Sequence, residues 1–128
     1  MEFPPISLDG AALAVSADSQ LGTLAHLNPS ACIQFANALL KDLDGALAAC
    51  TLGNSATSIA ARFEQIHTLK NMVISTGCKP LADACAALQS LCLATGDPAR
   101  ARETFDAIAQ AAQRLIANYR DGMVARAG

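Results

Sequence analysis

The sequence predicts an all-α protein, built as an antiparallel up-down-up-down four-helix bundle with a short N-terminal helical extension. Hydrophobic residues make up 52% of the 128 residues but aromatic residues only 4%, so the core must be aliphatic, and about one residue in five is Ala, the best helix former. Apolar residues recur at helical spacing in four long stretches. The eight Gly and five Pro are too few for an all-β chain with many tight turns.

The Asn28-Pro29 dipeptide separates the predicted N-terminal helices from the first long helix of the bundle. Residues 6–27 are expected to hold one or two short helices that cover an end of the bundle. Asn28-Pro29 is typical of an N-cap followed by proline at the first helical position, so a long helix should start there. Its apolar positions have helical spacing and are Ile33, Phe35 or Ala36, Leu39, Leu40, Leu43 and Leu47.

The second long helix is predicted over about 55–76, after the break at 51–55, whose sequence is TLGNS. Gly77 follows this helix and is expected to end it in the left-handed conformation. Gly77 is therefore the predicted structural turn before the next helix. The apolar side of this helix is formed by Ile59, Phe63, Ile66, Leu69 and Val73.

Two further helices complete the bundle. The third starts near Pro80 and stops at Thr95-Gly96, and the fourth runs from Pro98 to about Val124 after a second cap-and-proline signal at Asp97. Their inward positions are Leu81, Ala84, Cys85, Leu88 and Leu91 or Cys92, and then Phe105, Ile108, Ala112, Leu115, Ile116 and Tyr119. Short connections between long helices favour an antiparallel bundle, so we expect one domain with an extension at 1–28 and the bundle at 29–128.

Charge and hydropathy exclude several classes of partner. The net charge is −2 and the isoelectric point about 5.5, so nothing favours nucleic acid or an anionic membrane. The longest uncharged stretch, 19–40, contains polar residues and does not resemble a membrane span, and the N-terminus lacks the basic residues of a secretory signal. We therefore expect a cytoplasmic chain that binds neither nucleic acid nor a membrane.

The five cysteines are an odd number and include no CxxC pair. They are expected to be small apolar core residues of a reducing compartment rather than disulfide partners. No second cluster of ligands at short spacing accompanies them, so no metal site is predicted. The positions are Cys32, Cys50, Cys78, Cys85 and Cys92.

One of the two histidines stands out. His26 precedes the first bundle helix and is interpreted as a surface or packing residue. On a helical wheel, His67 lies about a third of a turn from the apolar side of helix 55–76, at the solvent edge of the bundle. Lys70, three residues on, flanks the same edge. The neighbours of His67 on this face are Ala60, Glu64, Asn71 and Ile74.

The next helix brings Gln89 toward His67. Both residues are about eleven positions from the middle of the turn at 77–79, so they should lie side by side across the helix pair. A glutamine amide can hold one imidazole nitrogen, fix the tautomer and leave the other nitrogen free. A histidine nucleophile needs this arrangement because it must be neutral to attack.

The run from His67 through Thr68, Leu69 and Lys70 to Asn71, with Gly77 ten residues after the histidine, resembles the signature of histidine phosphotransfer (HPt) domains. That signature reads His, any residue, Leu, Lys, Gly, with a later Gly at the helix end. It continues with Leu, a small residue, Leu and Glu or Gln, matched here by Leu81, Cys85, Leu88 and Gln89. Asn71 replaces the usual Gly. The resemblance covers 30–125 and is most specific over 63–89.

The resemblance implies a role in two-component phosphorelays. His67 would be the phosphorylated residue, Lys70 would balance the phosphoryl charge and Gln89 would hydrogen-bond the imidazole or phosphoryl group. The chain would pass phosphoryl groups between aspartates of receiver domains, from response regulators or a hybrid sensor histidine kinase, without kinase activity of its own. It would need no cofactor, because Mg²⁺ is expected only on the receiver. The partner-binding surface would comprise Ala60, Phe63, Glu64, Asn71 and Ile74, and we expect a monomer.

The sequence leaves three alternatives to phosphotransfer. Asn71 favours an HPt-like docking module that binds a receiver or kinase without transferring phosphate. A sensor-kinase dimerisation domain usually has an acidic residue after its histidine and proline five residues on, where this chain has Thr68 and Met72. A metal or haem bundle is suggested by Glu64-Gln65-Ile66-His67, but no second helix mirrors that pair.

Overall fold

The computed structural model describes residues 13–94 and 97–127, which form five helices and no strand. The helices are α1 (Gln20–Leu27), α2 (Pro29–Ala49), α3 (Ile59–Ile74), α4 (Lys79–Ala94) and α5 (Pro98–Ala127). The all-α prediction is confirmed for these residues. The part of the predicted extension before residue 13 and the predicted stop at Thr95-Gly96 lie outside the described residues. No helix in the described part of the chain combines the length and hydrophobicity that crossing a membrane requires.

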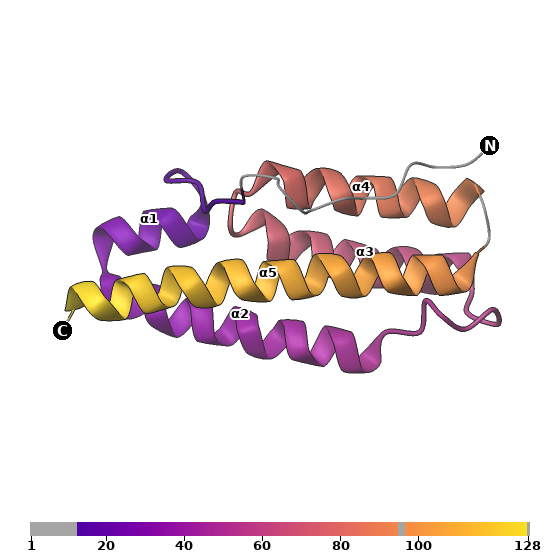
Figure 1. Cartoon of the computed structure of the whole chain (residues 1–128), viewed down its shortest axis with the longest axis horizontal. Coiled ribbons are helices and arrows are strands. Elements are labelled where there is room, and N and C mark those ends of the chain that lie inside the picture. Colours follow the sequence, from indigo (N-terminus) through magenta and orange to yellow (C-terminus); the bar gives the residue numbers. More distant parts are fainter. Residues whose placement is uncertain (1–12, 95–96, 128) are drawn as a thin grey trace.

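The four long helices lie side by side along the longest axis of the molecule (Figure 1). Contacts join α2 to α3 and α5, and α4 to α3 and α5, so each long helix packs against at least two others. The short α1 packs against α2. This packing places the apolar stripe of each helix between its neighbours, where burial of apolar surface is the main stabilising contribution.

The core is aliphatic, as the composition predicts. All six inward positions of α4 are buried, and α5 buries Phe105, Ile108, Ala112 and Ile116, while Leu115 and Tyr119 are half-buried. The five cysteines are buried and unpaired, which confirms their prediction as core residues. Burial raises the pKa of the Cys85 thiol to about 11, so this thiol stays protonated at neutral pH. The α4 positions are Leu81, Ala84, Cys85, Leu88, Leu91 and Cys92.

Both predicted helix starts with a capping residue followed by proline at the first helical position are confirmed. The Asn28 side chain accepts a hydrogen bond from the backbone N–H of Ala31 at 3.1 Å, with Pro29 as the first residue of α2. The Asp97 carboxylate accepts one from the N–H of Arg100 at 3.2 Å, at the start of α5. These caps satisfy N–H groups that have no partner inside their helix.

The start of α3 differs from the prediction. The sequence predicts a helix from about 55, but α3 begins at Ile59, behind Ser58, whose hydroxyl accepts from the N–H of Ala61 at 3.1 Å. The Asn54 side chain accepts from the N–H of Ala56 at 2.9 Å and so holds the preceding residues in a turn. The prediction that Ile59 points inward is wrong, because as the first residue of α3 it has an exposed fraction of 49%.

Two side chains of α3 hold the loop between α2 and α3. Arg62 is buried, with an exposed fraction of 6%, and its guanidinium donates to three carbonyl oxygens of the loop. These bonds offset the cost of removing a charge from water. Gln65 accepts from the N–H of Thr51 at 2.8 Å and donates to its hydroxyl at 2.7 Å. The carbonyls bound by Arg62 belong to Asn54, Ser55 and Thr57.

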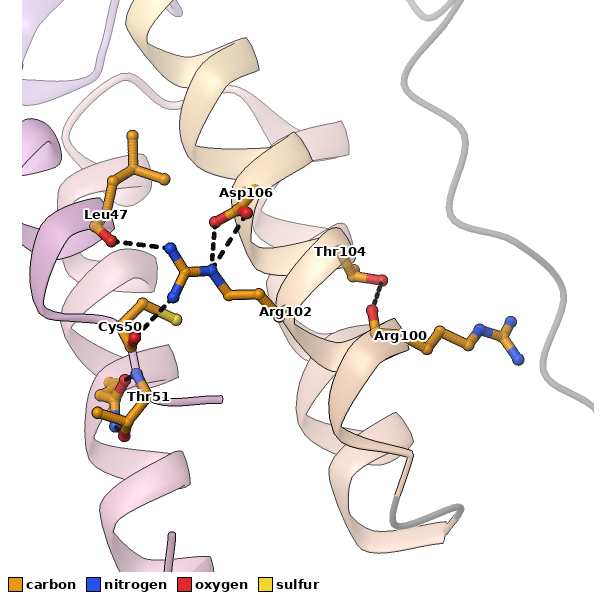
Figure 2. Close-up of polar contacts among 8 residues, drawn as sticks. Leu47, Cys50, Thr51, Arg100, Arg102, Thr104 and Asp106 are labelled. Carbon is orange, nitrogen blue, oxygen red and sulfur yellow. Dashed lines mark hydrogen bonds and ion pairs between the residues drawn. The ribbon is translucent and has the colours of Figure 1, made fainter. Parts of the chain in front are cut away.

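Arg102 of α5 caps the C-terminus of α2 (Figure 2). Its Nη1 donates to the Cys50 carbonyl at 2.6 Å and its Nη2 to the Leu47 carbonyl at 3.1 Å. Asp106 accepts from its Nε at 2.9 Å and 3.1 Å and so fixes the plane of the guanidinium. The last carbonyls of a helix lack partners and carry partial negative charge, so a cation is favoured there. This contact joins α2 and α5 at that end.

Replacing Arg102 with Ala should lower the free energy of unfolding by about 1–3 kcal/mol, since two backbone carbonyls and one carboxylate lose a charged donor. Urea denaturation followed by circular dichroism measures this. Arg114→Ala, which removes an exposed arginine of the same helix, is the matched control and should change stability by less than about 0.5 kcal/mol. Equal effects of the two substitutions would contradict a capping role for Arg102.

The N-terminal segment, from Ser16 to the first turn of α1, docks on the turn between α3 and α4. The N–H of Ser16 donates to the Thr76 carbonyl at 2.9 Å, and the N–H of Leu21 donates to the Ser75 carbonyl at 3.0 Å. Gly77 has φ of +67°, which confirms its predicted left-handed conformation. A side chain at Gly77 would collide with this N-terminal segment, so the glycine serves the turn and also the close approach of the segment.

Candidate functional site

The exposed face of α3 contains the predicted site residues. His67 is exposed in the middle of the helix, and Ala60, Glu64, Asn71 and Ile74 are exposed with it, as the helical wheel predicts. Phe63 is half-buried and packs against the core. Ile74 has an exposed fraction of 53%, a large value for a bulky apolar side chain two turns from a histidine. The face therefore combines an accessible imidazole with an apolar neighbour, which suits a protein partner.

Lys70 lies on the side of this face that borders α4. It is half-buried, and its positive charge acts on the Cys85 thiol of α4, where it opposes the larger effect of burial on the pKa. Lys70 has no ion-pair partner among the described residues. Its ammonium group is thus available to an anion that binds near His67, one helical turn away.

Gln89 is half-buried on α4, one turn beyond Cys85 on the same side of that helix. Because Lys70 lies near Cys85 and the chain reverses at 75–78, the residues of α4 level with His67 are those around Gln89. Within the described part of the chain, no hydrogen bond joins the Gln89 amide to the imidazole. The two side chains are thus placed at similar heights on a contacting helix pair and remain unbonded.

A groove runs along the other side of the face, between α3 and α2. Its volume is about 570 Å³, and Thr68 and Asn71 of α3 line one wall. A smaller hollow of about 210 Å³ continues it past Glu64. The α2 wall comprises Lys41, Asp42, Gly45 and Ala46, none of which the sequence analysis singled out. Only packing of the two helices brings them across the groove from Thr68 and Asn71, so no local pattern could have identified them.

The described side chains offer no set of metal ligands. In residues 13–94 and 97–127, no group of three or more His, Cys, Asp or Glu side chains comes together in a way that could hold one. Glu64 lies one turn before His67 on the same exposed face. That spacing makes it a neighbour of the imidazole at the protein surface.

These features define a class of protein: an all-helical chain that presents one histidine on an exposed helix face, between a lysine and a groove. Comparison with protein families finds a match to the Hpt domain over residues 30–118. The chain belongs to the Hpt domain family, as its resemblance to the HPt signature predicts, and this family implies histidine phosphotransfer in two-component signalling. Searches of curated proteins and of solved structures gave no match.

Proposed function

We propose that this protein relays a phosphoryl group between aspartates of receiver domains through a phosphohistidine at His67. The observation that carries the proposal is the exposed position of His67 in the middle of α3, within the segment that matches the Hpt domain. A surface imidazole on a rigid helix can be reached by a second protein, which must bring its aspartyl phosphate to the ring nitrogen. His26, the other histidine, lies outside the matched segment.

The chemistry is a reversible in-line exchange. The lone pair of neutral His67 Nε2 attacks the phosphorus of an aspartyl phosphate. A phosphorus–nitrogen bond forms, the acyl phosphate phosphorus–oxygen bond breaks, and the aspartate leaves as a carboxylate. The Nδ1 proton stays on the ring. In the reverse step, an aspartate of a second receiver takes the phosphoryl group and His67 returns to its neutral form.

Two neighbours support this exchange. Lys70 attracts the phosphoryl oxygens, and its lack of a described ion-pair partner leaves its charge available for that role. Gln89 accepts a hydrogen bond from Nδ1–H of His67 in the complex and so holds the reactive tautomer. The charge of the transferring group is neutralised mainly by Mg²⁺ on the receiver, and the protein itself uses no cofactor.

The proposal also includes the order of the helices, the state of the protein and the face on which the receiver docks. Helices α2 to α5 form an up-down-up-down bundle at 29–128, and the segment 1–28 extends it as part of one domain. The helix contacts described above support that order. The protein works as a cytoplasmic monomer without kinase activity. The receiver docks over the exposed face of α3, where Ala60, Phe63, Glu64, Asn71 and Ile74 surround His67.

A docking module without phosphotransfer is the second candidate function. Asn71 favours it, because a side chain replaces the usual glycine of the signature one turn from His67, where the partner must approach. In that case a receiver would bind the face of α3 and no phosphohistidine would form.

The experiment that separates these functions is incubation with a panel of phosphorylated receiver domains, followed by intact mass measurement. The proposed function requires a gain of one phosphoryl group that acid removes and alkali leaves in place, since phosphoramidates of histidine are acid-labile. Binding of a receiver, measured by calorimetry, without any mass gain would favour the docking module. An acid-stable gain would assign the phosphoryl group to another residue and contradict the proposal.

Replacing Lys70 with Ala should slow phosphotransfer about two- to fivefold, because ion pairs of partly exposed groups contribute up to about 1 kcal/mol. Receiver binding should stay unchanged, and Lys70→Arg should retain the wild-type rate. Rapid-quench kinetics with one receiver measures the rate. Lys79→Ala removes an exposed lysine at the start of α4 and is the matched control. A wild-type rate and phosphohistidine lifetime in Lys70→Ala would remove Lys70 from the site.

A further inference from the structure

Glu64 is the only acidic residue of α3, and it lies one turn before His67 on the same exposed face. Side chains of a helix tilt toward its N-terminal end, so the imidazole of His67 tilts toward the turn that contains Glu64. Lys70, one turn after His67, tilts toward the imidazole in the same way. A phosphoryl group on His67 would therefore lie between a carboxylate and an ammonium group.

The carboxylate of Glu64 has no role in holding the fold together. Among the described residues it has no ion-pair partner, and the Thr68 hydroxyl donates to the backbone carbonyl of Glu64 at 3.0 Å rather than to its side chain. Glu64 also lines the hollow of about 210 Å³, and none of the other residues that line it is charged. Its negative charge is therefore not neutralised within the described part of the chain.

The helices that border this face add no net charge to it. On α2, Lys41 and Asp42 are exposed neighbours of opposite charge across the groove. On α4, the residues around Gln89 are uncharged. The electrostatic environment of the imidazole is therefore set mainly by Lys70 and Glu64, whose charges have opposite signs. The attraction of Lys70 for a phosphoryl group is offset by repulsion from Glu64.

We propose that Glu64 sets the direction of the relay, because its carboxylate destabilises phospho-His67 relative to the aspartyl phosphate of a receiver. Phosphorylation replaces a neutral imidazole with a group that carries about two negative charges. The repulsion ends when the phosphorus–nitrogen bond breaks and the phosphoryl group passes to an acceptor aspartate, which returns the imidazole to its neutral form. Glu64 acts through its charge and forms no bond to phosphorus. This inference rests on the proposed function, which supplies the phosphohistidine.

The test is the equilibrium constant for phosphoryl exchange with one receiver, measured by intact mass as the ratio of phosphohistidine to aspartyl phosphate. At protein concentrations well below the Kd of the complex, this ratio depends only on the free species, so docking does not affect it. Glu64→Gln removes the charge and keeps the shape, and it should raise the equilibrium constant about two- to fivefold at low salt. Glu64→Lys should raise it further, and Glu64→Asp should stay near the wild type.

Two controls accompany these variants. Glu103→Gln removes an exposed glutamate of α5, outside the face of α3, and should leave the equilibrium constant at the wild-type value. Salt screens interactions between exposed charges, so the gain in Glu64→Gln should shrink when the salt concentration is raised to about 0.5 M. Receiver affinity is measured in parallel by calorimetry, because Glu64 also belongs to the proposed docking face.

A wild-type equilibrium constant in Glu64→Gln overturns the inference, and acid-labile phosphate on His67 would still uphold the proposed function. If only the receiver affinity changes, Glu64 serves docking alone and the inference also fails. A gain that persists at about 0.5 M salt would assign the effect to a structural change instead of the charge. Absence of acid-labile phosphate on the wild type contradicts the proposed function itself, since no phosphohistidine then exists for Glu64 to destabilise.

Discussion

A His67→Gln variant should accept no phosphoryl group from any receiver, a loss of at least about a thousandfold, because an amide nitrogen has no lone pair that can attack phosphorus. The side chain is exposed in the middle of α3, and glutamine is a better helix former than histidine. The free energy of unfolding should therefore change by less than about 0.5 kcal/mol. Intact mass after incubation with a phosphorylated receiver measures uptake, and thermal denaturation measures stability.

The matched control for this variant is His26→Gln. His26 is the only other histidine of the chain and is exposed in α1, outside the segment that matches the Hpt domain. The His26→Gln variant should take up the phosphoryl group at the wild-type rate. Residual acid-labile phosphate on His67→Gln, or its loss in His26→Gln, would move the phosphorylated position away from α3. Unfolding of His67→Gln would instead assign His67 a structural role.

The largest stability effect is expected for Gly77→Ala. Alanine at φ of +67° costs about 1–2 kcal/mol relative to glycine. Its Cβ would also lie 2.5 Å from the Cβ of Ser16 and 2.9 Å from that of Ser19, so the N-terminal segment must move away. The bonds of that segment to Ser75 and Thr76 would weaken with it. We expect a total loss of more than about 2 kcal/mol, or roughly 8 °C in Tm.

Two further variants separate the causes of this loss. Asparagine tolerates the left-handed conformation better than alanine but has a Cβ, so Gly77→Asn keeps the collision and removes part of the backbone cost. A similar loss in both variants would assign the effect to the contact with the N-terminal segment. Gly122→Ala, at an open helical position, should instead stabilise the protein by up to about 1 kcal/mol. An unchanged Tm for Gly77→Ala would contradict the close packing of this turn.

The sequence allowed the helices and the histidine face to be predicted because both depend on local rules. Apolar spacing of 3.6 residues identified the buried side of α4 position by position. The two cap-and-proline signals located the starts of α2 and α5. The same periodicity placed His67, Asn71 and Ile74 on an exposed face, and the spacing from His67 to Gly77 indicated the family.

The packing of the helices determined the features that local sequence rules do not predict. The start of α3 lies at Ile59 because side chains of α3 fix the preceding loop: Arg62 binds its carbonyls, and Gln65 binds Thr51, 14 residues earlier, just after the end of α2. Arg62 looks like a surface residue in the sequence, but the loop carbonyls that it binds keep it buried. Arg102 contacts Cys50 across 52 residues, a distance that no local pattern spans.

By itself, therefore, the sequence determined the helical class, the exposed histidine and the family, because helix periodicity, caps and short motifs act over a few residues. Only the tertiary structure determined how the α2–α3 loop is held, how the N-terminal segment docks on Gly77, and how Gly45 comes to lie across a groove from Asn71. Those features depend on contacts between distant segments, whose geometry is set when the apolar stripes of all the helices are buried together.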